Sequence, residues 1–169
     1  VRQYVEILEG CYSILSTERF NAKTKSGVLR KEKKIYFMDP LIMAALVTWA
    51  EKGEVDPSWI AAQWADPVQQ GKWVENVVAC ELRKRQCRVF YDVQCGNEID
   101  FVFAPPGKDQ WQAIECKRSA PHPQEVRGLG QYPGAEIWVS ERVAAQKARE
   151  DKRLEFPVFW TPERLLSFI

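Results

Sequence analysis

Apolar residues at the start of the chain recur at helical spacing, and shorter segments with alternating polar and apolar residues follow. The first pattern predicts an opening helix that ends near Cys11 or Tyr12. The alternation predicts two short strands at 14–20 and 33–38, connected by a polar loop that contains Gly27. The first part of the chain therefore has the pattern of a helix followed by a long hairpin.

Three Asp-Pro pairs predict helix starts, because Asp accepts hydrogen bonds from the first backbone N–H groups and Pro suits the first turn. The pairs are Asp39-Pro40, Asp56-Pro57 and Asp66-Pro67. The first pair precedes 41–50, which is predicted to be a mostly buried helix. The third opens the longest predicted helix, which runs to about Gln86.

The remainder of the chain alternates between predicted strands and helices. The expected elements are strands at 88–93, 98–103 and 111–117, a helix at 123–130, a strand at 136–140, a helix at 144–152, a strand at 158–160 and a final helix from Pro162. From Pro67 onward the order is α-β-β-β-α-β with an appended strand and helix. This order predicts an α/β (α+β) fold with a mixed sheet flanked by helices.

Composition limits the classes of function. The chain has 169 residues, 24 Lys and Arg and 23 Asp and Glu, so its net charge of +1 excludes a uniformly basic nucleic-acid coat. Its five cysteines form no CxxC pair, which indicates reduced thiols and a cytoplasmic protein. No apolar run is long enough for a membrane span, and a start at Val1 leads us to expect part of a longer polypeptide.

Candidate chemistry lies in two predicted strands. Alternation of the first places Asp100 on the face opposite to three apolar side chains, namely Ile99, Phe101 and Phe103. In the next strand Glu115 and Lys117 share one face, so Asp100, Glu115 and Lys117 can meet if the strands pair.

Two carboxylates beside an ammonium group suit a hard divalent cation such as Mg²⁺ or Mn²⁺, and Glu75 on the long helix can add a further carboxylate. Such a site is suited to phosphodiester hydrolysis. The same residues also fit an ordinary exposed ion pair beside a solvated Asp, and spacing does not decide between the two.

Asp100 followed by Glu115-Cys116-Lys117 resembles the core signature of the PD-(D/E)XK nuclease superfamily, and the element order matches its restriction-endonuclease-like core. A longer set of stretches resembles the C-terminal domain of uncharacterised bacterial and archaeal AAA-type ATPases. These stretches are Lys33-Lys34-Ile35-Tyr36-Phe37-Met38-Asp39-Pro40, Gly71-Lys72-Trp73-Val74-Glu75-Asn76, Cys80-Glu81-Leu82, Asn97-Glu98-Ile99-Asp100-Phe101-Val102 and Ile114-Glu115-Cys116-Lys117.

This resemblance implies three parts: a partial winged-helix segment at 1–39, comprising its last helix and wing, a helical connector at 40–66, and a nuclease-like domain at 67–169. It implies an ATPase domain upstream as a partner. The chain itself has no GxxxxGK[ST] motif, so ATP hydrolysis is not assigned to it.

The resemblance also implies roles for individual residues. Asp100 and Glu115 would be metal ligands, the Cys116 backbone carbonyl a further ligand, Lys117 the lysine that orients water or stabilises charge, and Glu75 the helix carboxylate. The expected function is metal-dependent cleavage of DNA. The alternatives are a non-catalytic nucleic-acid-binding module and a regulatory or oligomerising module of the ATPase.

Basic residues gather in the predicted hairpin. A nucleic-acid contact is the functional interpretation, and a solvated hairpin is the alternative. The expected contact residues, to which Arg118 is added, are Lys23, Lys25, Arg30, Lys31, Lys33 and Lys34. DNA is the expected ligand, RNA is also allowed, and no membrane contact is expected.

Overall fold

The computed structural model of the chain describes residues 2–29, 31–94 and 96–167. The helices are α1 (Arg2–Gly10), α2 (Pro40–Lys52), α3 (Pro57–Ala65), α4 (Pro67–Lys84), the 3₁₀ helix η1 (Pro123–Gln131), α5 (Arg142–Glu150) and α6 (Thr161–Ser167). The strands are β1 (Ile14–Thr17), β2 (Phe20–Asn21), β3 (Ser26–Gly27), β4 (Lys34–Phe37), β5 (Arg88–Gln94), β6 (Asn97–Ala104), β7 (Gln112–Lys117), β8 (Glu136–Val139) and β9 (Val158–Trp160). The predicted order is confirmed from Pro40 onward, whereas the hairpin before it contains the additional short pair β2–β3.

The Asp-Pro signals mark helix starts for the expected physical reason. Asp39 accepts a hydrogen bond of 2.7 Å from the backbone N–H of Leu41 at the start of α2. Asp56 accepts hydrogen bonds from the N–H groups of Ser58 and Trp59 at the start of α3. Gly53 ends α2 in the left-handed region with φ of 80°, a conformation that glycine adopts without a Cβ clash. Local sequence therefore fixes the ends of these helices.

The main sheet is mixed and has the strand order β5-β6-β7-β8-β9. Strands β5, β6 and β7 pair antiparallel, whereas β7, β8 and β9 pair parallel. The change of direction follows the connections, because short turns join the first three strands and helical segments join the last three. The α/β fold class predicted from the sequence is confirmed.

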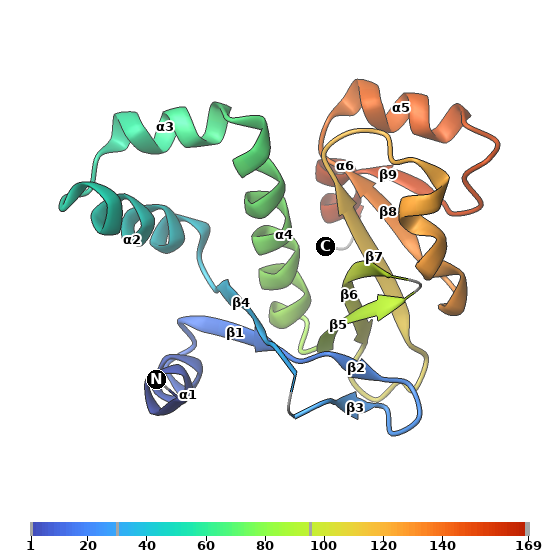
Figure 1. Cartoon of the computed structure of the whole chain (residues 1–169), viewed down its shortest axis with the longest axis horizontal. Helices are drawn as coiled ribbons and strands as arrows, with labels where there is room; N and C mark the ends of the chain where they lie inside the picture. Colours follow the sequence, from blue (N-terminus) through green and yellow to red (C-terminus); the bar gives the residue numbers. More distant parts are fainter. Residues whose placement is uncertain (1, 30, 95, 168–169) are drawn as a thin grey trace.

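Helices cover both faces of this sheet (Figure 1). On one face, α4 packs Val78 and Leu82 against aromatic side chains of β6 and Trp138 of β8. On the other face, η1 and α5 pack Leu129 and Ala145 among others against a second cluster. The sheet is the central layer between two hydrophobic clusters, and its central strands are buried on both sides.

The N-terminal hairpin packs into both clusters. Its outer strands β1 and β4 pair antiparallel, and the short pair β2–β3 lies inside the connecting segment. Phe20 of β2 lies 4.5 Å from the Trp111 ring, measured between centroids, and Tyr36 of β4 lies 5.4 Å from Phe101. Residues 1–39 thus contribute side chains to the core of the sheet, while the boundary expected at residue 39 stays a prediction.

The expectation that 41–50 forms a mostly buried helix is half wrong. The helix is present as α2, but only Ala44 and Thr48 are buried on it. Leu41 and Trp49 are 67% and 60% exposed. Apolar composition predicted burial here, whereas the described elements cover only one narrow face of α2.

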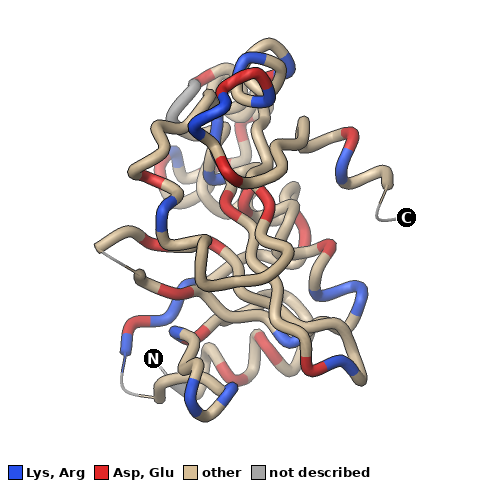
Figure 2. The backbone as a smooth tube through the Cα atoms, turned by 90° about the vertical axis from the view of Figure 1, so that its right-hand side faces the viewer, with Lys and Arg blue, Asp and Glu red and all other residues tan. Residues whose placement is uncertain are grey.

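Charged positions are interspersed along the backbone (Figure 2). Among the described residues, no helix combines the length and the apolar character that crossing a membrane requires. Cys11, Cys80, Cys87 and Cys116 are free thiols, as expected, and Cys95 lies outside the described residues.

Candidate functional site: an acidic pocket where two strands separate

The candidate residues lie where β6 and β7 separate. The antiparallel ladder between these strands ends at the pair Phe101–Ile114. Beyond this pair β7 continues alone along β8 through Glu115 and Lys117. Asp100 is the next residue of β6 past the last pair, so the end of the ladder brings its carboxylate near the outgoing end of β7.

A β-bulge sets the position of Asp100. Between two regular pairs of the β5–β6 ladder, Asp100 and Phe101 of β6 lie opposite the single residue Tyr91 of β5. The extra residue interrupts the alternation of β6. Phe101 and Phe103 pack in the α4 cluster, whereas Ile99 packs in the cluster on the other face. The expectation that all three apolar side chains share one face is therefore wrong.

Asp100 and Glu115 are held by reciprocal hydrogen bonds between the two strands. The Asp100 Oδ2 atom accepts a hydrogen bond of 2.9 Å from the backbone N–H of Cys116. The Glu115 Oε2 atom accepts one of 3.3 Å from the backbone N–H of Asp100. Both residues are buried, with 7% and 3% of their surface exposed. Each carboxylate is fixed by the strand that carries the other.

Two lysines contact these carboxylates. Lys117 Nζ lies 2.8 Å from Glu115 Oε1, as the shared strand face predicts. Lys34 reaches in from β4, and its Nζ lies 2.7 Å from a Glu98 oxygen, 3.2 Å from Asp100 Oδ1 and 3.7 Å from a Glu75 oxygen. The structure thus brings Glu75, Asp100, Glu115 and Lys117 together and adds Lys34.

The pKa values of the carboxyl groups in the site are raised, because these groups are buried close to one another. Burial, with repulsion from Asp100, raises the pKa of Glu115 to about 8, although Lys117 opposes the shift. The same two causes raise the pKa of Glu75 to about 7, against the attraction of Lys34. Burial also raises the pKa of Asp100. Burial disfavours the charge of Lys34, but the attraction of Asp100 and its neighbours outweighs this and raises the Lys34 pKa. The site therefore favours additional positive charge.

A pocket of about 380 Å³ opens beside these groups. Its lining includes all four sequence-predicted catalytic residues, together with Cys116, Gly96, Asn97, Glu98 and Glu125. Glu125 comes from η1, where its side chain accepts a hydrogen bond from the backbone N–H of His122. The pocket offers carboxylates from α4, β6, β7 and η1 around one space, which we call the acidic pocket.

The family model described as "Domain of unknown function (DUF4143)" matches residues 70–160, which is more than half of the chain. The chain belongs to this family. No curated protein and no solved structure matches the chain. The DUF4143 match includes Glu75, Asp100, Glu115 and Lys117, whereas Lys34 lies outside it.

The donor atoms of the DUF4143 acidic pocket fit a hydrated divalent cation. Each carboxylate oxygen of Asp100 and Glu115 already accepts one hydrogen bond, but a carboxylate offers about four lone-pair positions. Mg²⁺ keeps several waters and needs only one or two carboxylates. Within the described ranges, no three or more His, Cys, Asp and Glu side chains are grouped so that they could hold a metal ion. A cation held entirely by side chains is therefore not the arrangement to test. The arrangement to test is a hydrated cation held by the carboxylates of Asp100 and Glu115 and by the Cys116 carbonyl.

Three of the predicted nucleic-acid-binding residues have acidic partners on the surface. The pairs, with N···O distances, are Lys25–Asp109 at 3.1 Å, Lys33–Glu18 at 2.9 Å and Arg118–Glu141 at 2.8 Å. These side chains are partly exposed, and exposed pairs of this kind contribute little to stability. Their predicted role in nucleic-acid binding stays a prediction.

The other basic residues fall into different environments. Lys34 faces the carboxylates of the acidic pocket, so it does not lie on an open basic surface. Lys23 and Lys31 are exposed, and Arg30 lies outside the described residues. The described basic residues of the hairpin therefore do not all face the same surface.

Sequence reasoning missed three residues of the site. Glu98 lies two residues before Asp100 in the same strand, and both line the acidic pocket. This spacing could have indicated from the sequence that Glu98 belongs to the site. Glu125 lies in the first turn of η1. A capping pattern in the sequence indicates this helix start, but it does not indicate that Glu125 lines the pocket. Lys34 contacts residues 41 to 66 positions away, and no local pattern predicts such a contact.

Proposed function

We propose that the acidic pocket binds Mg²⁺ or Mn²⁺ and that the domain hydrolyses phosphodiester bonds in DNA. One observation carries the proposal: Asp100 and Glu115 are locked to each other's strands at the open end of the β6–β7 ladder, with Lys117 against Glu115. Five carboxyl groups of the described residues line the acidic pocket and two lysines contact them, so a divalent cation would compensate the remaining negative charge.

The chain's own residues have distinct tasks in this proposal. Asp100, Glu115 and the Cys116 carbonyl would hold the cation, which when bound supplies charge neutralisation and lowers the pKa of a water. Lys117 orients that water or stabilises the charge that develops on the phosphate. Glu75, with its pKa raised to about 7, can exchange a proton near neutral pH.

The test is cleavage of supercoiled and single-stranded DNA by the chain with Mg²⁺ or Mn²⁺. We expect cleavage, and we expect Asp100→Asn and Lys117→Ala to reduce its rate by roughly 100-fold or more. Glu150→Gln and Lys147→Ala serve as matched controls, because both residues are exposed on α5. Cleavage that persists in both site variants, or no cleavage with either cation, contradicts the proposal.

A second candidate is a DNA-binding or regulatory module that does not cut, forming the C-terminal part of an ATPase as the sequence resemblance implies. The observation that favours it is the position of Lys34, whose ammonium already compensates three carboxylates. Binding to DNA that weakens steeply with salt, without cleavage by the unmodified chain, supports this candidate.

A further inference from the structure

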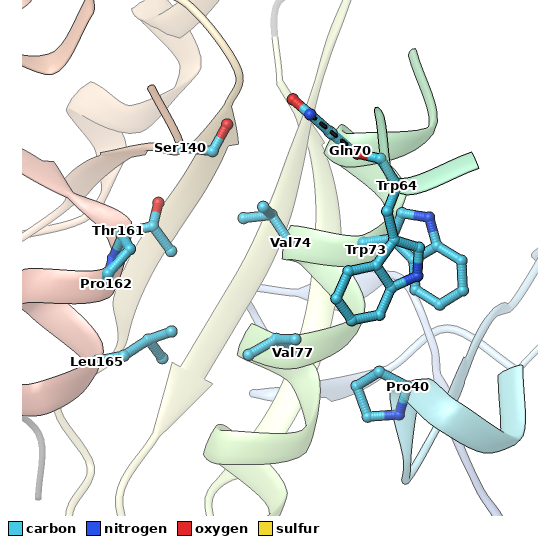
Figure 3. A pocket seen from close by; sticks show the side chains of 10 residues that line it. All are labelled: Pro40, Trp64, Gln70, Trp73, Val74, Val77, Ser140, Thr161, Pro162 and Leu165. Atoms are coloured by element: carbon cyan, nitrogen blue, oxygen red, sulfur yellow. Dashed lines mark hydrogen bonds between the residues drawn. The ribbon is translucent and has the colours of Figure 1, made fainter. Parts of the chain in front are cut away.

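A second pocket lies on the side of α4 that faces α6, away from the acidic pocket (Figure 3). Its volume is about 380 Å³. Figure 3 shows Val74 and Val77 of α4 on one side and Ser140, Thr161 and Leu165 on the other. Both its volume and its mixture of apolar walls with few polar groups are typical of small-molecule sites. We call it the α4–α6 pocket.

The walls of the α4–α6 pocket are uncharged and partly aromatic. None of the described residues that line it is Asp, Glu, Lys, Arg or His. Trp64 and Trp73 form one wall, with ring centroids 5.6 Å apart, and Trp64 is still 48% exposed. Burying a charged group here would lack a compensating partner, so the chemistry selects an uncharged ligand with a flat apolar body.

Two hydroxyl groups at the α4–α6 pocket have no hydrogen-bond partner. Thr161 is only 3% exposed, and neither its Oγ1 atom nor Ser140 Oγ is paired within the described part of the chain. A buried hydroxyl without a partner carries a desolvation cost. Each hydroxyl can donate a hydrogen bond, and a carbonyl oxygen is a suitable acceptor.

We propose that the α4–α6 pocket binds a small neutral molecule with an aromatic or similarly flat apolar body and a carbonyl or amide group. The apolar body lies against Trp73, Val74 and Val77, and the carbonyl oxygen accepts a hydrogen bond from Ser140 or Thr161. The absence of charged lining residues argues against nucleotides and phosphates. The site is independent of the proposed nuclease function, because none of the described residues lines both pockets.

The test uses benzamide, benzoate and toluene as probes, followed by ¹H–¹⁵N NMR titration of the unmodified chain. Benzamide is expected to shift the amide signals of Val74, Val77, Thr161 and Leu165 in a saturable manner. Benzoate has the same shape but carries a charge, so we expect its affinity to be at least about tenfold lower. Toluene should bind at the same residues, because it keeps the apolar body.

Variants test the hydroxyls separately from the apolar walls. Thr161→Val keeps the shape and removes the hydroxyl, so benzamide affinity should fall about fivefold to tenfold while toluene affinity stays unchanged. Ser140→Ala should also weaken benzamide and spare toluene. Thr17→Val is the matched control, because Thr17 is also buried with an unpartnered hydroxyl but does not line the α4–α6 pocket.

Three results overturn the proposal. The first is no saturable shift at the pocket residues with benzamide or toluene. The second is equal affinity for benzamide and benzoate, which means that charge plays no part. The third is unchanged benzamide affinity in both Thr161→Val and Ser140→Ala, which leaves an apolar contact surface for a protein partner as the better interpretation.

Discussion

A single ammonium group holds much of the acidic pocket together. Lys34 Nζ contacts carboxylate oxygens of Glu75, Glu98 and Asp100, which come from α4 and β6, while Lys34 itself belongs to β4. Its side chain is 21% exposed, so solvent screens these contacts only in part. Lys34 is therefore an internal counter-ion, and a divalent cation in the same space competes with it.

Removing this counter-ion distinguishes a cation site from a structural ion-pair cluster. We expect Lys34→Met to lower the free energy of unfolding by about 2 kcal/mol without divalent cations, because the loss of one partner leaves buried carboxylates uncompensated. Millimolar Mg²⁺ or Mn²⁺ should then stabilise this variant more than the unmodified chain, since the competitor is gone. Urea unfolding with and without cation measures both effects.

Lys33→Met is the matched control for this experiment. Lys33 is the adjacent residue, and its ammonium pairs with Glu18 outside the acidic pocket. We expect a change below about 1 kcal/mol and no greater stabilisation by cations than in the unmodified chain. Equal stabilisation of both variants by cations would show that Lys34 does not compete with them, and no stabilisation of either variant would show that the acidic pocket does not bind them.

At the scale of elements, η1 packs very close to the sheet. A Cβ added at Gly128 would lie 3.0 Å from the Gln94 Cβ atom and 3.3 Å from the Gln94 backbone oxygen. Gly130, two residues later in the same helix, would meet nothing nearer than Phe156 at 4.0 Å. The close approach of η1 holds Glu125 at the acidic pocket and Val126 and Leu129 in the core.

This packing predicts different effects for two similar substitutions. Gly128→Ala should lower the free energy of unfolding by about 1–2 kcal/mol, because the backbone of β5 cannot move away without disturbing the sheet. Gly130→Ala should change it by less than about 0.5 kcal/mol. Thermal unfolding of both variants measures the difference, and equal effects would show that η1 is packed less tightly than described.

Local signals explain which elements could be predicted from the sequence. The helix starts at Asp39 and Asp56 depend on hydrogen bonds within three residues, and they are where the sequence places them. The proximity of Glu115 and Lys117 follows from strand alternation alone. The bulge at Asp100 depends on pairing with β5, so alternation along β6 gave the wrong faces. Lys34 enters the site through the packing of β4 on α4, which no local pattern contains.

Across the whole molecule, the N-terminal hairpin and the sheet share one core. Phe20 is 6% exposed and packs against Phe90, Trp111 and Tyr132. On the other face, the amide of Asn76 on α4 bonds both the N–H and the carbonyl of Phe37, so a helix side chain takes the place of a strand partner. These contacts lead us to expect one cooperative unit.

Phe20→Ala tests this expectation. We expect one unfolding transition for the unmodified chain and a single transition weakened by about 3–5 kcal/mol for the variant, because a buried ring leaves a cavity in the shared core. Leu29→Ala is the control, since Leu29 is 82% exposed. Trp fluorescence and far-ultraviolet circular dichroism should report the same midpoint. Separate midpoints for the two signals would favour an independent hairpin.

The bulge of β6 makes the position of the site depend on a count of residues. Deleting one residue between Ile99 and Val102 would restore a regular ladder with β5 even if every acidic residue were retained. If the pair Val102–Ala113 is kept, Asp100 would then lie opposite Ile114, inside the β6–β7 ladder instead of past its end. When related chains are aligned, a gap at this point is thus as informative about loss of the site as the replacement of Asp100 itself.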